Sequence, residues 1–269
     1  MRTGAALALA LAALAAGCGG DARGSTAAGE LRVCADPNNL PFSNQREEGF
    51  ENRLAELLAD EMRATVAYTW WPQRRSFLRN TLRAHECDVV MGVPTGYELV
   101  HATRPYYRST YVFVYPADQG WEIRSFDDPV LHELKVGVHL IGDDGANAPP
   151  AHALARRGMV DNVRGYLVYG DYSEDSPPAR ILDALETGEI DVAVVWGPLA
   201  GYFAPRASIP LAIVPVAPEI DLPFLPMVYD ISLGVRRGDT IFARRLEEIL
   251  VRRRPGVDSL LASYGVPLR

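Results

Sequence analysis

From Leu31 onward, short apolar segments typical of strands alternate with amphipathic segments typical of helices. The first such pair is a strand over Leu31–Asp36 and a helix over Glu51–Arg63, whose apolar residues recur at helical spacing. Alternation of this kind predicts right-handed βαβ units on a mainly parallel sheet. The chain of 269 residues is long enough to repeat the unit and to bury a core in each half.

The alternation runs through two similar cycles. The first contains strands over Thr65–Trp71, Cys87–Val93 and Tyr111–Tyr115 and a helix over Ser76–Glu86; the second contains strands over Lys135–Leu140, Gly165–Tyr169 and Ile190–Trp196 and helices over Pro150–Arg157 and Ser176–Thr187. We therefore expect an α/β fold of two lobes, residues 31–115 with 230–269 and residues 116–229. Two hinge crossings, near Pro116 and near Met227–Tyr229, would join them. A hinged pair of this kind binds its ligand between the lobes, at the carboxyl ends of the strands.

The first 30 residues are predicted to lie outside this fold. An apolar run from Ala5 to Ala16 is shorter than the about 20 residues that span a bilayer and fits the hydrophobic core of a secretion signal. It ends in Ala15-Ala16-Gly17-Cys18, which is similar to a bacterial lipobox. Residues 1–17 are therefore predicted to be a lipoprotein signal peptide, with Cys18 as the lipidated residue and 18–30 as a flexible tether. Simple cleavage without lipidation is the alternative. Both interpretations place the protein in the periplasm, and the only membrane contact predicted is the lipid of the first interpretation.

Charge and motif content exclude several classes of function. Lys and Arg number 27 against 34 Asp and Glu, and the resulting formal net charge of −7 argues against a nucleic-acid partner. The five histidines show no metal-ligand spacing, and no nucleophile elbow, P-loop or Rossmann fingerprint occurs. The turn Gly142-Asp-Asp-Gly145 has too few oxygen ligands for calcium. We expect no metal, no cofactor and no catalysis.

Two cysteines remain in the predicted fold, and the sequence leaves their state open. Cys34 and Cys87 are an even pair in an oxidising compartment, which allows a disulfide. If their strands end at the same cleft, however, the two residues are offset by about four positions, or roughly 13 Å. A disulfide needs Cα atoms within ~7 Å. The alternative is two buried thiols that pack as small apolar groups.

The order of elements from Leu31 to Pro267 resembles the family 3 solute-binding proteins of the periplasm, through Gly49-Phe50-Glu51 among other stretches. The resemblance implies the two-lobed, type II periplasmic-binding-protein fold. In amino-acid-binding members, a Thr-Pro-Glu-Arg stretch supplies an arginine that clamps the ligand carboxylate. Here Thr95 is followed by Gly-Tyr-Glu, so that arginine is missing and Glu98 would repel a carboxylate. The acid of the second lobe is missing as well, which argues against an amino-acid ligand.

Four longer stretches resemble a narrower branch, the MoxJ-like and XoxJ-like proteins associated with quinoprotein dehydrogenases. They are Cys34–Ser43, Trp70–Arg75 with Arg79–Thr81, Cys87–Pro94 and Thr103–Val112. The resemblance implies a periplasmic accessory that aids the assembly or activation of a PQQ-dependent methanol or alcohol dehydrogenase, with that enzyme's cytochrome c as a further partner. Two alternatives stay open: the substrate-binding lipoprotein of an ABC transporter for a small non-amino-acid solute, and a dehydratase with Glu98 as general acid.

Residues at the predicted strand ends are the candidates for contact with a ligand or partner. Arg74 and Arg75 follow two tryptophans, a combination that suits anions and protein interfaces, although a solvated pair at a helix start is the alternative. Asn38 and Asn39 either bind a ligand or form a turn, and the aromatic residues either line the cleft or fill the core. The full set is Asn38, Asn39, Phe42, Trp71, Arg74, Arg75, Thr95, Tyr106, Tyr107 and Trp196.

Overall fold

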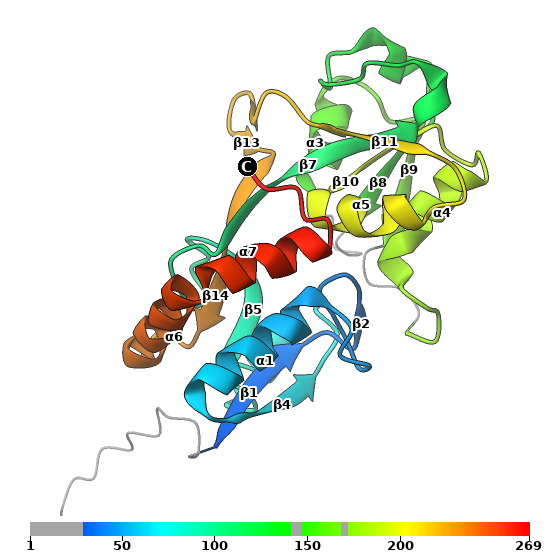
Figure 1. The fold of residues 1–269 in the computed structure, drawn as a ribbon. Helices are drawn as coiled ribbons and strands as arrows, with labels where there is room; N and C mark the ends of the chain where they lie inside the picture. The colour runs from blue at the N-terminus through cyan, green and yellow to red at the C-terminus, as the bar shows by residue number, and fades with distance from the viewer. Residues whose placement is uncertain (1–28, 141–146, 168–171) are drawn as a thin grey trace, which may run out of the picture.

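A computed structural model of the protein describes residues 29–140, 147–167 and 172–269. The predicted signal peptide, Cys18, most of the tether and the turn Gly142-Asp-Asp-Gly145 lie outside the described residues. The rest forms two lobes joined by the long strands β7 (Tyr107–Pro116) and β14 (Val228–Val235) (Figure 1). The predicted two-lobed α/β fold is confirmed. Among the described residues, no helix is both long and apolar enough to cross a membrane.

The first lobe is built from the two ends of the described chain. Its parallel strands lie in the order β4-β1-β5, next to β14. Helix α1 begins after Gly49, whose N–H donates to the side chain of Asn52 at 3.1 Å, and ends before Arg63, which adopts a left-handed conformation. The elements of this lobe are β1 (Glu30–Ala35), β2 (Asn38–Asn39), β3 (Ser43–Asn44), α1 (Phe50–Met62), β4 (Thr65–Trp70), α2 (Phe77–Asn80), β5 (Val89–Pro94), β6 (His101–Ala102), α6 (Thr240–Arg252) and α7 (Arg254–Ser263).

The second lobe is built from the middle of the chain around three parallel strands in the order β10-β8-β9. A fourth strand, β11, pairs with β7 in the antiparallel direction, and a short hairpin of β12 and β13 precedes β14. The elements are β8 (Val136–Leu140), α3 (Pro149–Arg156), β9 (Val163–Leu167), α4 (Arg180–Glu186), β10 (Val192–Trp196), α5 (Gly197–Phe203), β11 (Leu211–Pro215), β12 (Ile220–Asp221), β13 (Leu225–Pro226) and the 3₁₀ turns 117–119, 129–132, 177–179 and 204–206.

The two crossing strands lie side by side, and β7 belongs to both lobes. Its residues Tyr107 to Thr110 pair with β14, whereas from Tyr111 onward it pairs with β10 and β11. The longer strands of both lobes therefore form one continuous hydrogen-bonded sheet, and the pairs β2-β3 and β12-β13 are separate from it.

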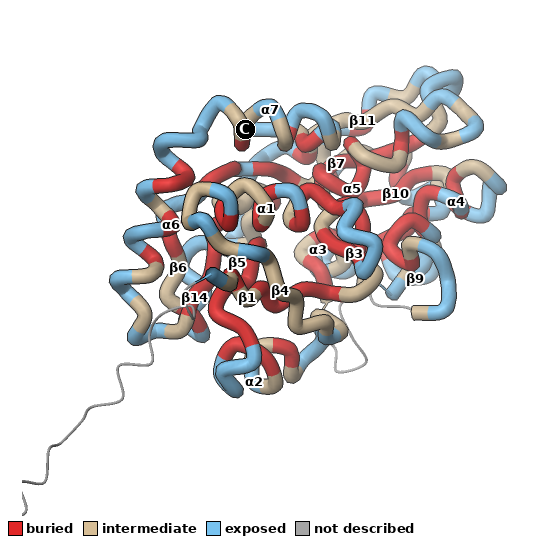
Figure 2. Tube along the Cα trace, turned by 60° about the horizontal axis from the view of Figure 1, so that its bottom comes forward, coloured by how far each residue is buried: buried red, intermediate tan, exposed pale blue. Residues whose placement is uncertain are grey.

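The cores follow from the alternation of side chains along the strands. Val112 and Val114 of β7 pack with Ile181 and α5 on one face of the sheet, whereas Phe113 and Tyr115 pack on the other. A separate core in the first lobe packs α1 and α6 against β1, β5 and β14. In Figure 2, the buried positions run along these strands and along the inner faces of the helices.

The C-terminal residues cross from the first lobe back to the second. The ring of Tyr264 stacks on Tyr202 of α5, with centroids 5.6 Å apart. Gly265 has a φ of +67° and lies so close to Gly201 that a Cβ on either residue would overlap the other's backbone. The hydroxyl of Ser109, on β7, donates to the carbonyl of Pro267 at 2.6 Å. This C-terminal tail is thus a third connection between the lobes.

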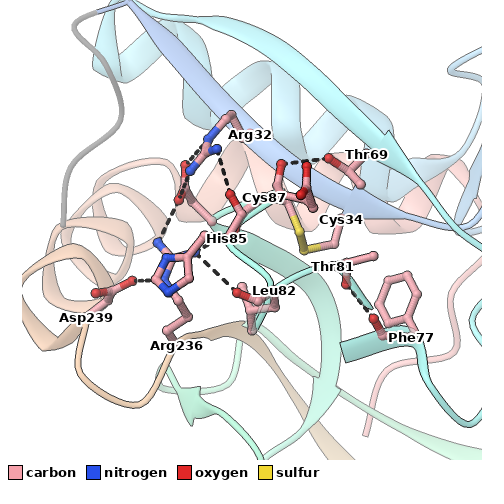
Figure 3. The surroundings of a disulfide bond; sticks show 12 residues. Arg32, Cys34, Thr69, Phe77, Thr81, Leu82, His85, Cys87, Arg236 and Asp239 are labelled. Carbon is pink, nitrogen blue, oxygen red and sulfur yellow. Dashed lines mark hydrogen bonds and ion pairs between the residues drawn. A yellow bond between two sulfur atoms is a disulfide. The ribbon is translucent and has the colours of Figure 1, made fainter. Parts of the chain in front are cut away.

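Cys34 and Cys87 form a disulfide, with Cα atoms 5.4 Å apart (Figure 3). The expected offset of roughly 13 Å is wrong because Cys87 does not open the strand. Strand β5 begins at Val89, and the residues before it turn back beneath β1 and β4. The hydroxyl of Thr69 donates to the carbonyl of Glu86 at 2.8 Å, and this contact holds the turn in place.

The helix predicted over Ser76–Glu86 is largely wrong, since α2 ends at Asn80. At Thr81 the backbone leaves the helical region, and its hydroxyl bonds back to the carbonyl of Phe77 at 2.7 Å. Such local bonds compete with helix propagation. The turns that follow deliver Cys87 to the disulfide.

The predicted start of the second-lobe helix at Ser176 is also shifted. Ser176 has a φ of +49° and makes no capping hydrogen bond through its side chain. A 3₁₀ turn over Pro177–Ala179 comes first, closed by the N–H of Ala179, which donates to the carbonyl of Ser176 at 2.8 Å, and α4 follows.

An ion cluster lies beside the disulfide. The carboxylate of Asp88 accepts hydrogen bonds from Arg32 and Arg236, each at 2.7 Å, and Arg236 also donates to the carbonyl of Cys87 at 2.6 Å (Figure 3). Burial by itself would raise the pKa of Asp88, but the two guanidiniums outweigh it and the pKa is lowered. The segment before β5 is thus fixed to β1 and to the end of β14.

Replacing Cys34 and Cys87 by serine should lower the free energy of unfolding. The bond closes a loop with a sequence separation of 53, for which the loss of chain entropy in the unfolded state corresponds to about 4 kcal/mol. Urea denaturation of the oxidised protein and of the double variant measures the difference. Dithiothreitol should destabilise the wild type and leave the variant unchanged. Equal urea midpoints for the oxidised wild type and the variant would contradict the prediction.

Candidate functional site

The two lobes contact each other at Tyr172 of the second lobe, which lies beside the carboxyl end of β1 in the first lobe. Its hydroxyl donates to Asp36 Oδ2 at 3.0 Å. The guanidinium of Arg74 lies over the Tyr172 ring, 5.5 Å from its centroid. This arrangement brings a carboxylate, a phenol and a guanidinium together between the lobes.

Asp36 is the centre of this contact. It follows β1 directly and is buried. Besides Tyr172, the backbone N–H groups of Asn38 and Gln73 donate to its carboxylate, at 2.8 and 2.7 Å. Burial raises the pKa of Asp36, and the three hydrogen bonds offset only part of that effect. One side chain thus positions two loops of the first lobe and binds the second lobe.

Two further contacts extend the boundary. The side-chain amide of Asn38 donates to the carbonyl of Glu174 at 2.6 Å, and Arg46 lies 3.7 Å from Asp175 at the exposed edge. We use the term interlobe seam for residues 36–46, 71–75 and 172–175. The predicted contact residues Asn38, Asn39, Trp71, Arg74 and Arg75 all lie in it.

Asn39 is buried at the seam, and its amide nitrogen lies 3.4 Å from the side-chain oxygen of Gln73. Its Oδ1 has no hydrogen-bond partner among the described residues. Trp71 is 40% exposed, and Arg74 and Arg75 are exposed as well. The seam therefore presents an aromatic ring and two guanidiniums to its surroundings.

Glu51 is a candidate site residue that the sequence analysis did not select. It lies in the first turn of α1, and its Oε1 lies over Gly92 of β5, where a Cβ would overlap it. No hydrogen bond or ion pair reaches its carboxyl group from the described residues. Burial, with a smaller contribution from the charge of Asp36, raises the pKa of Glu51 to about 8. A glycine inside an apolar strand often marks such a close approach, so Gly92 indicates in the sequence that another group lies against β5.

Three aromatic rings meet where the crossing strands enter the second lobe. Trp196, at the end of β10, lies 5.3 Å from Tyr111 and 5.9 Å from Tyr229, measured between ring centroids. All three are only half-buried. Trp196 was predicted, whereas Tyr111 and Tyr229 were missed because their approach depends on the pairing of β7 with β10 and β14.

Three predicted residues, one of them Phe42 of the seam, pack into the core of the first lobe. Tyr106 and Tyr107 are buried in the core of the first lobe, where the hydroxyl of Tyr106 donates to the carbonyl of Met91 at 3.0 Å. Phe42 packs edge-on against Phe50, with centroids 5.4 Å apart. For these three residues the structure shows core packing, which was the alternative to contact with a ligand.

Thr95 and Glu98 are both exposed and line a surface depression together with Arg237. The hydroxyl of Thr95 bonds to that of Ser232 at 2.6 Å. Within the described ranges, no three His, Cys, Asp or Glu side chains are grouped as metal ligands. What the seam and its surroundings offer is hydrogen bonding, charge and aromatic surface, which are the means of binding.

Comparison with known proteins finds relatives by sequence and by structure. No family model matches the chain. Protein MoxJ of Methylorubrum extorquens is 31% identical over 253 residues, which cover 90% of this chain and 82% of MoxJ. The crystal structure of MxaJ from Methylophaga aminisulfidivorans superposes with a TM-score of 0.76 at 29% identity, covering 89% of this chain and 100% of that one. The periplasmic binding protein XoxJ of Methylobacterium extorquens gives 0.73 at 32% identity, covering 89% and 99%.

Replacing Tyr172 by phenylalanine should loosen the seam. The change removes a hydrogen bond to a buried carboxylate, worth about 1.5–3 kcal/mol. Amides of residues 36–46 and 71–75 should therefore exchange with solvent at least about tenfold faster. Native-state hydrogen exchange measures this effect. Tyr166→Phe is the matched control, because that hydroxyl bonds to Glu189 within the second lobe. Equal exchange in both variants would show that Tyr172 does not hold the lobes together.

Replacing Glu51 by glutamine should stabilise the protein increasingly as the pH rises. The pKa of Glu51 is about 8 in the folded state, against an ordinary 4.5. The folded protein therefore favours the neutral carboxyl group, and the wild type loses stability as the pH rises from 4.5 to 8. The variant stays neutral, so its advantage should be near zero at pH 4 and largest above pH 8. Urea denaturation at several pH values tests this. Asp60→Asn, at an exposed position of the same helix, is the control, and an advantage independent of pH would contradict the expectation.

Proposed function

Because this chain belongs to the MoxJ family of periplasmic binding proteins, we propose that it is a periplasmic accessory protein of a PQQ-dependent methanol or alcohol dehydrogenase and aids that enzyme's assembly or activation. The observation that carries the proposal is the relation to MoxJ along 90% of the chain. A relation of that length includes both lobes, both crossing strands and the seam. The association with a quinoprotein dehydrogenase is what the sequence resemblance implies for this family.

In the proposed mechanism, residues 31–115 with 230–269 and residues 116–229 move as two bodies, and a segment of the partner or a small ligand binds between them. Asp36 and Tyr172 join the lobes in the closed state. A partner that binds one state more tightly than the other shifts the population toward it. Arg74, Arg75 and Trp71 form the contact at the edge of the seam, since guanidinium and aromatic groups are favoured at protein interfaces.

The site supports binding rather than catalysis. The dehydratase alternative needs a buried Glu98, whereas Glu98 is exposed. In the same proposal, a lipid on Cys18 holds the protein at a membrane, and the cytochrome c of the dehydrogenase is a further partner.

A second candidate function is that of a receptor for a small solute that is not an amino acid. The observation that favours it is the carboxyl group of Glu51, which receives no hydrogen bond from the described residues and lies near Asp36. Two acidic groups beside aromatic rings suit a cation or a ligand rich in hydrogen-bond donors. They do not suit the carboxylate of an amino acid.

Binding to the purified apo and holo forms of the host's PQQ-dependent alcohol dehydrogenase tests the main proposal. We expect saturable binding by residues 29–269 in biolayer interferometry, weakened about tenfold or more by Arg74→Ala with Arg75→Ala, because interface arginines are frequent hot spots. The matched control is Arg244→Ala with Arg245→Ala, a second exposed arginine pair on α6.

Preference for the apo form would support a role in assembly. Absence of binding to either form at tens of micromolar would overturn the proposal. A rise in melting temperature with a small amine would then favour the receptor.

A further inference from the structure

The C-terminal tail, residues 264–269, leaves α7 of the first lobe and packs at once on α5 of the second lobe. Tyr264 directly follows Ser263, the last residue of α7, and its ring stacks on that of Tyr202. Gly265 follows, with its backbone against that of Gly201. Figure 1 shows the end of α7 beside α5. Since no spare residues separate α7 from these contacts, α5 stays beside the end of α7 as long as the contacts last.

The end of the tail is fixed as well. Besides the bond from Ser109 to the carbonyl of Pro267, the N–H of Arg269 donates to the carbonyl of Arg108 at 3.0 Å. Both partners lie on the crossing strand β7. Pro267 also packs against Gly197 at the start of α5, where a Cβ would lie 2.6 Å from the proline ring. Tyr264 is therefore held between α7 on one side and attached tail residues on the other.

Tyr264 binds the first lobe too, through its hydroxyl. That group donates to the carbonyl of Glu48 at 2.6 Å, and the tyrosine ring lies 5.9 Å from that of Phe50, measured between centroids. Glu48 belongs to the loop between β3 and α1. One side chain thus contacts α5 of the second lobe with its ring and a loop of the first lobe with its hydroxyl.

Hydrogen bonds connect this loop with the interlobe seam. The N–H of Glu48 donates to Asn44 Oδ1 at 2.8 Å, and the amide of Asn44 donates to Glu48 Oε2 at 2.7 Å. Asn44 is buried and pairs with Asn38 across β2 and β3. Asn38 in turn donates to the carbonyl of Glu174 in the second lobe. A continuous series of bonded residues thus leads from Tyr264 to a contact between the lobes.

We propose that the C-terminal tail is a strap that favours the state in which the lobes touch at the seam, and that Tyr264 is the positioning residue through which it acts. Its ring stays with α5, and its hydroxyl holds the loop that places Asn38 opposite Glu174. When the lobes part at the seam, α5 and that loop move relative to each other, so one of the two contacts of Tyr264 weakens. A state that keeps both contacts is favoured over one that keeps a single contact.

The test compares native-state hydrogen exchange in residues 29–269 of the wild type and of Tyr264→Phe, which keeps the ring and removes the hydroxyl. Amides of residues 36–46 should exchange about fivefold faster, as expected for the loss of one hydrogen bond to a neutral carbonyl. Amides of β8, in the core of the second lobe, should exchange as in the wild type. The matched control is Tyr115→Phe, whose hydroxyl bonds to the carbonyl of Trp121 within the second lobe at 2.9 Å.

Combining Tyr264→Phe with Asn38→Ala tests whether the bonded residues carry the effect. If Tyr264 acts by placing Asn38, the double variant should exchange at residues 36–46 little faster than Asn38→Ala alone. Factors that simply multiply would show that the two residues act independently, and Tyr264 would not be a positioning residue for the seam.

A second variant ends at Val266 and so removes residues 267–269 while leaving Tyr264 in place. It should accelerate exchange at residues 36–46 as well. Small-angle X-ray scattering should give it a larger radius of gyration than the wild type, because lobes that part make the molecule longer. Circular dichroism should show that it is folded. Exchange and scattering equal to those of the wild type would show that the tail is not a strap.

Two results with Tyr264→Phe would overturn the proposal. One is unchanged exchange at residues 36–46. The other is an equal acceleration throughout both lobes, since a residue that stabilises only the fold as a whole affects every strongly protected amide alike. The test uses this protein alone and does not involve the dehydrogenase, so either result leaves the proposed function as it stands.

Discussion

The pairing of β7 with β14 is the constraint on which the rest of the molecule depends. The two strands that cross between the lobes are hydrogen-bonded neighbours, and β7 then continues into the sheet of the second lobe. The lobes are thus joined by a two-stranded ribbon, which bends and twists more easily than it stretches. The position of the ribbon decides which side chains meet: it brings Tyr111 and Tyr229 to Trp196, and it sets the end of β1 opposite Tyr172.

Much of the fold could be predicted because the strands are short, apolar and rich in β-branched residues, and because the helices between them are amphipathic. Strands such as β8 and β10 and helices such as α1 and α3 lie within a few residues of their predicted positions. The failures have local and distant causes: the hydroxyl of Thr81 bonds to Phe77 four residues earlier, whereas the path of the residues after it is decided by contacts distant in the sequence. The segment from Thr81 to Cys87 is held by the disulfide to Cys34 and by the bonds of the adjacent Asp88 to Arg32 and Arg236, and these three partners are far from it in the chain.

The candidate site was predicted only in part, because some of its residues are brought together by contacts between segments distant in the sequence. Asn38, Asn39 and Arg74 lie where the ends of parallel strands in the first lobe were expected to converge, and the structure brings them together. Tyr172 was missed because its partner Asp36 lies 136 residues away in the sequence. Glu51 was missed because an acid in the first turn of a helix has a sufficient local explanation in the helix dipole. Only the proximity of Gly92 and Asp36 shows that its carboxyl group lies against the sheet, in a half-buried position.

The contact of the C-terminal tail with α5 has a consequence for how the lobes can move. Two backbones that touch through Gly201 and Gly265 leave no room for side chains to rearrange. This contact therefore allows the lobes to rotate about it but not to slide past each other. A rotation of one lobe about this contact would displace each atom in proportion to its distance from the contact. A rotation about this contact would leave the neighbours of Gly201 and Gly265 in place, whereas the hydrogen bond between Tyr172 and Asp36, which involves other residues, would break once its two oxygens move apart by more than about 1 Å.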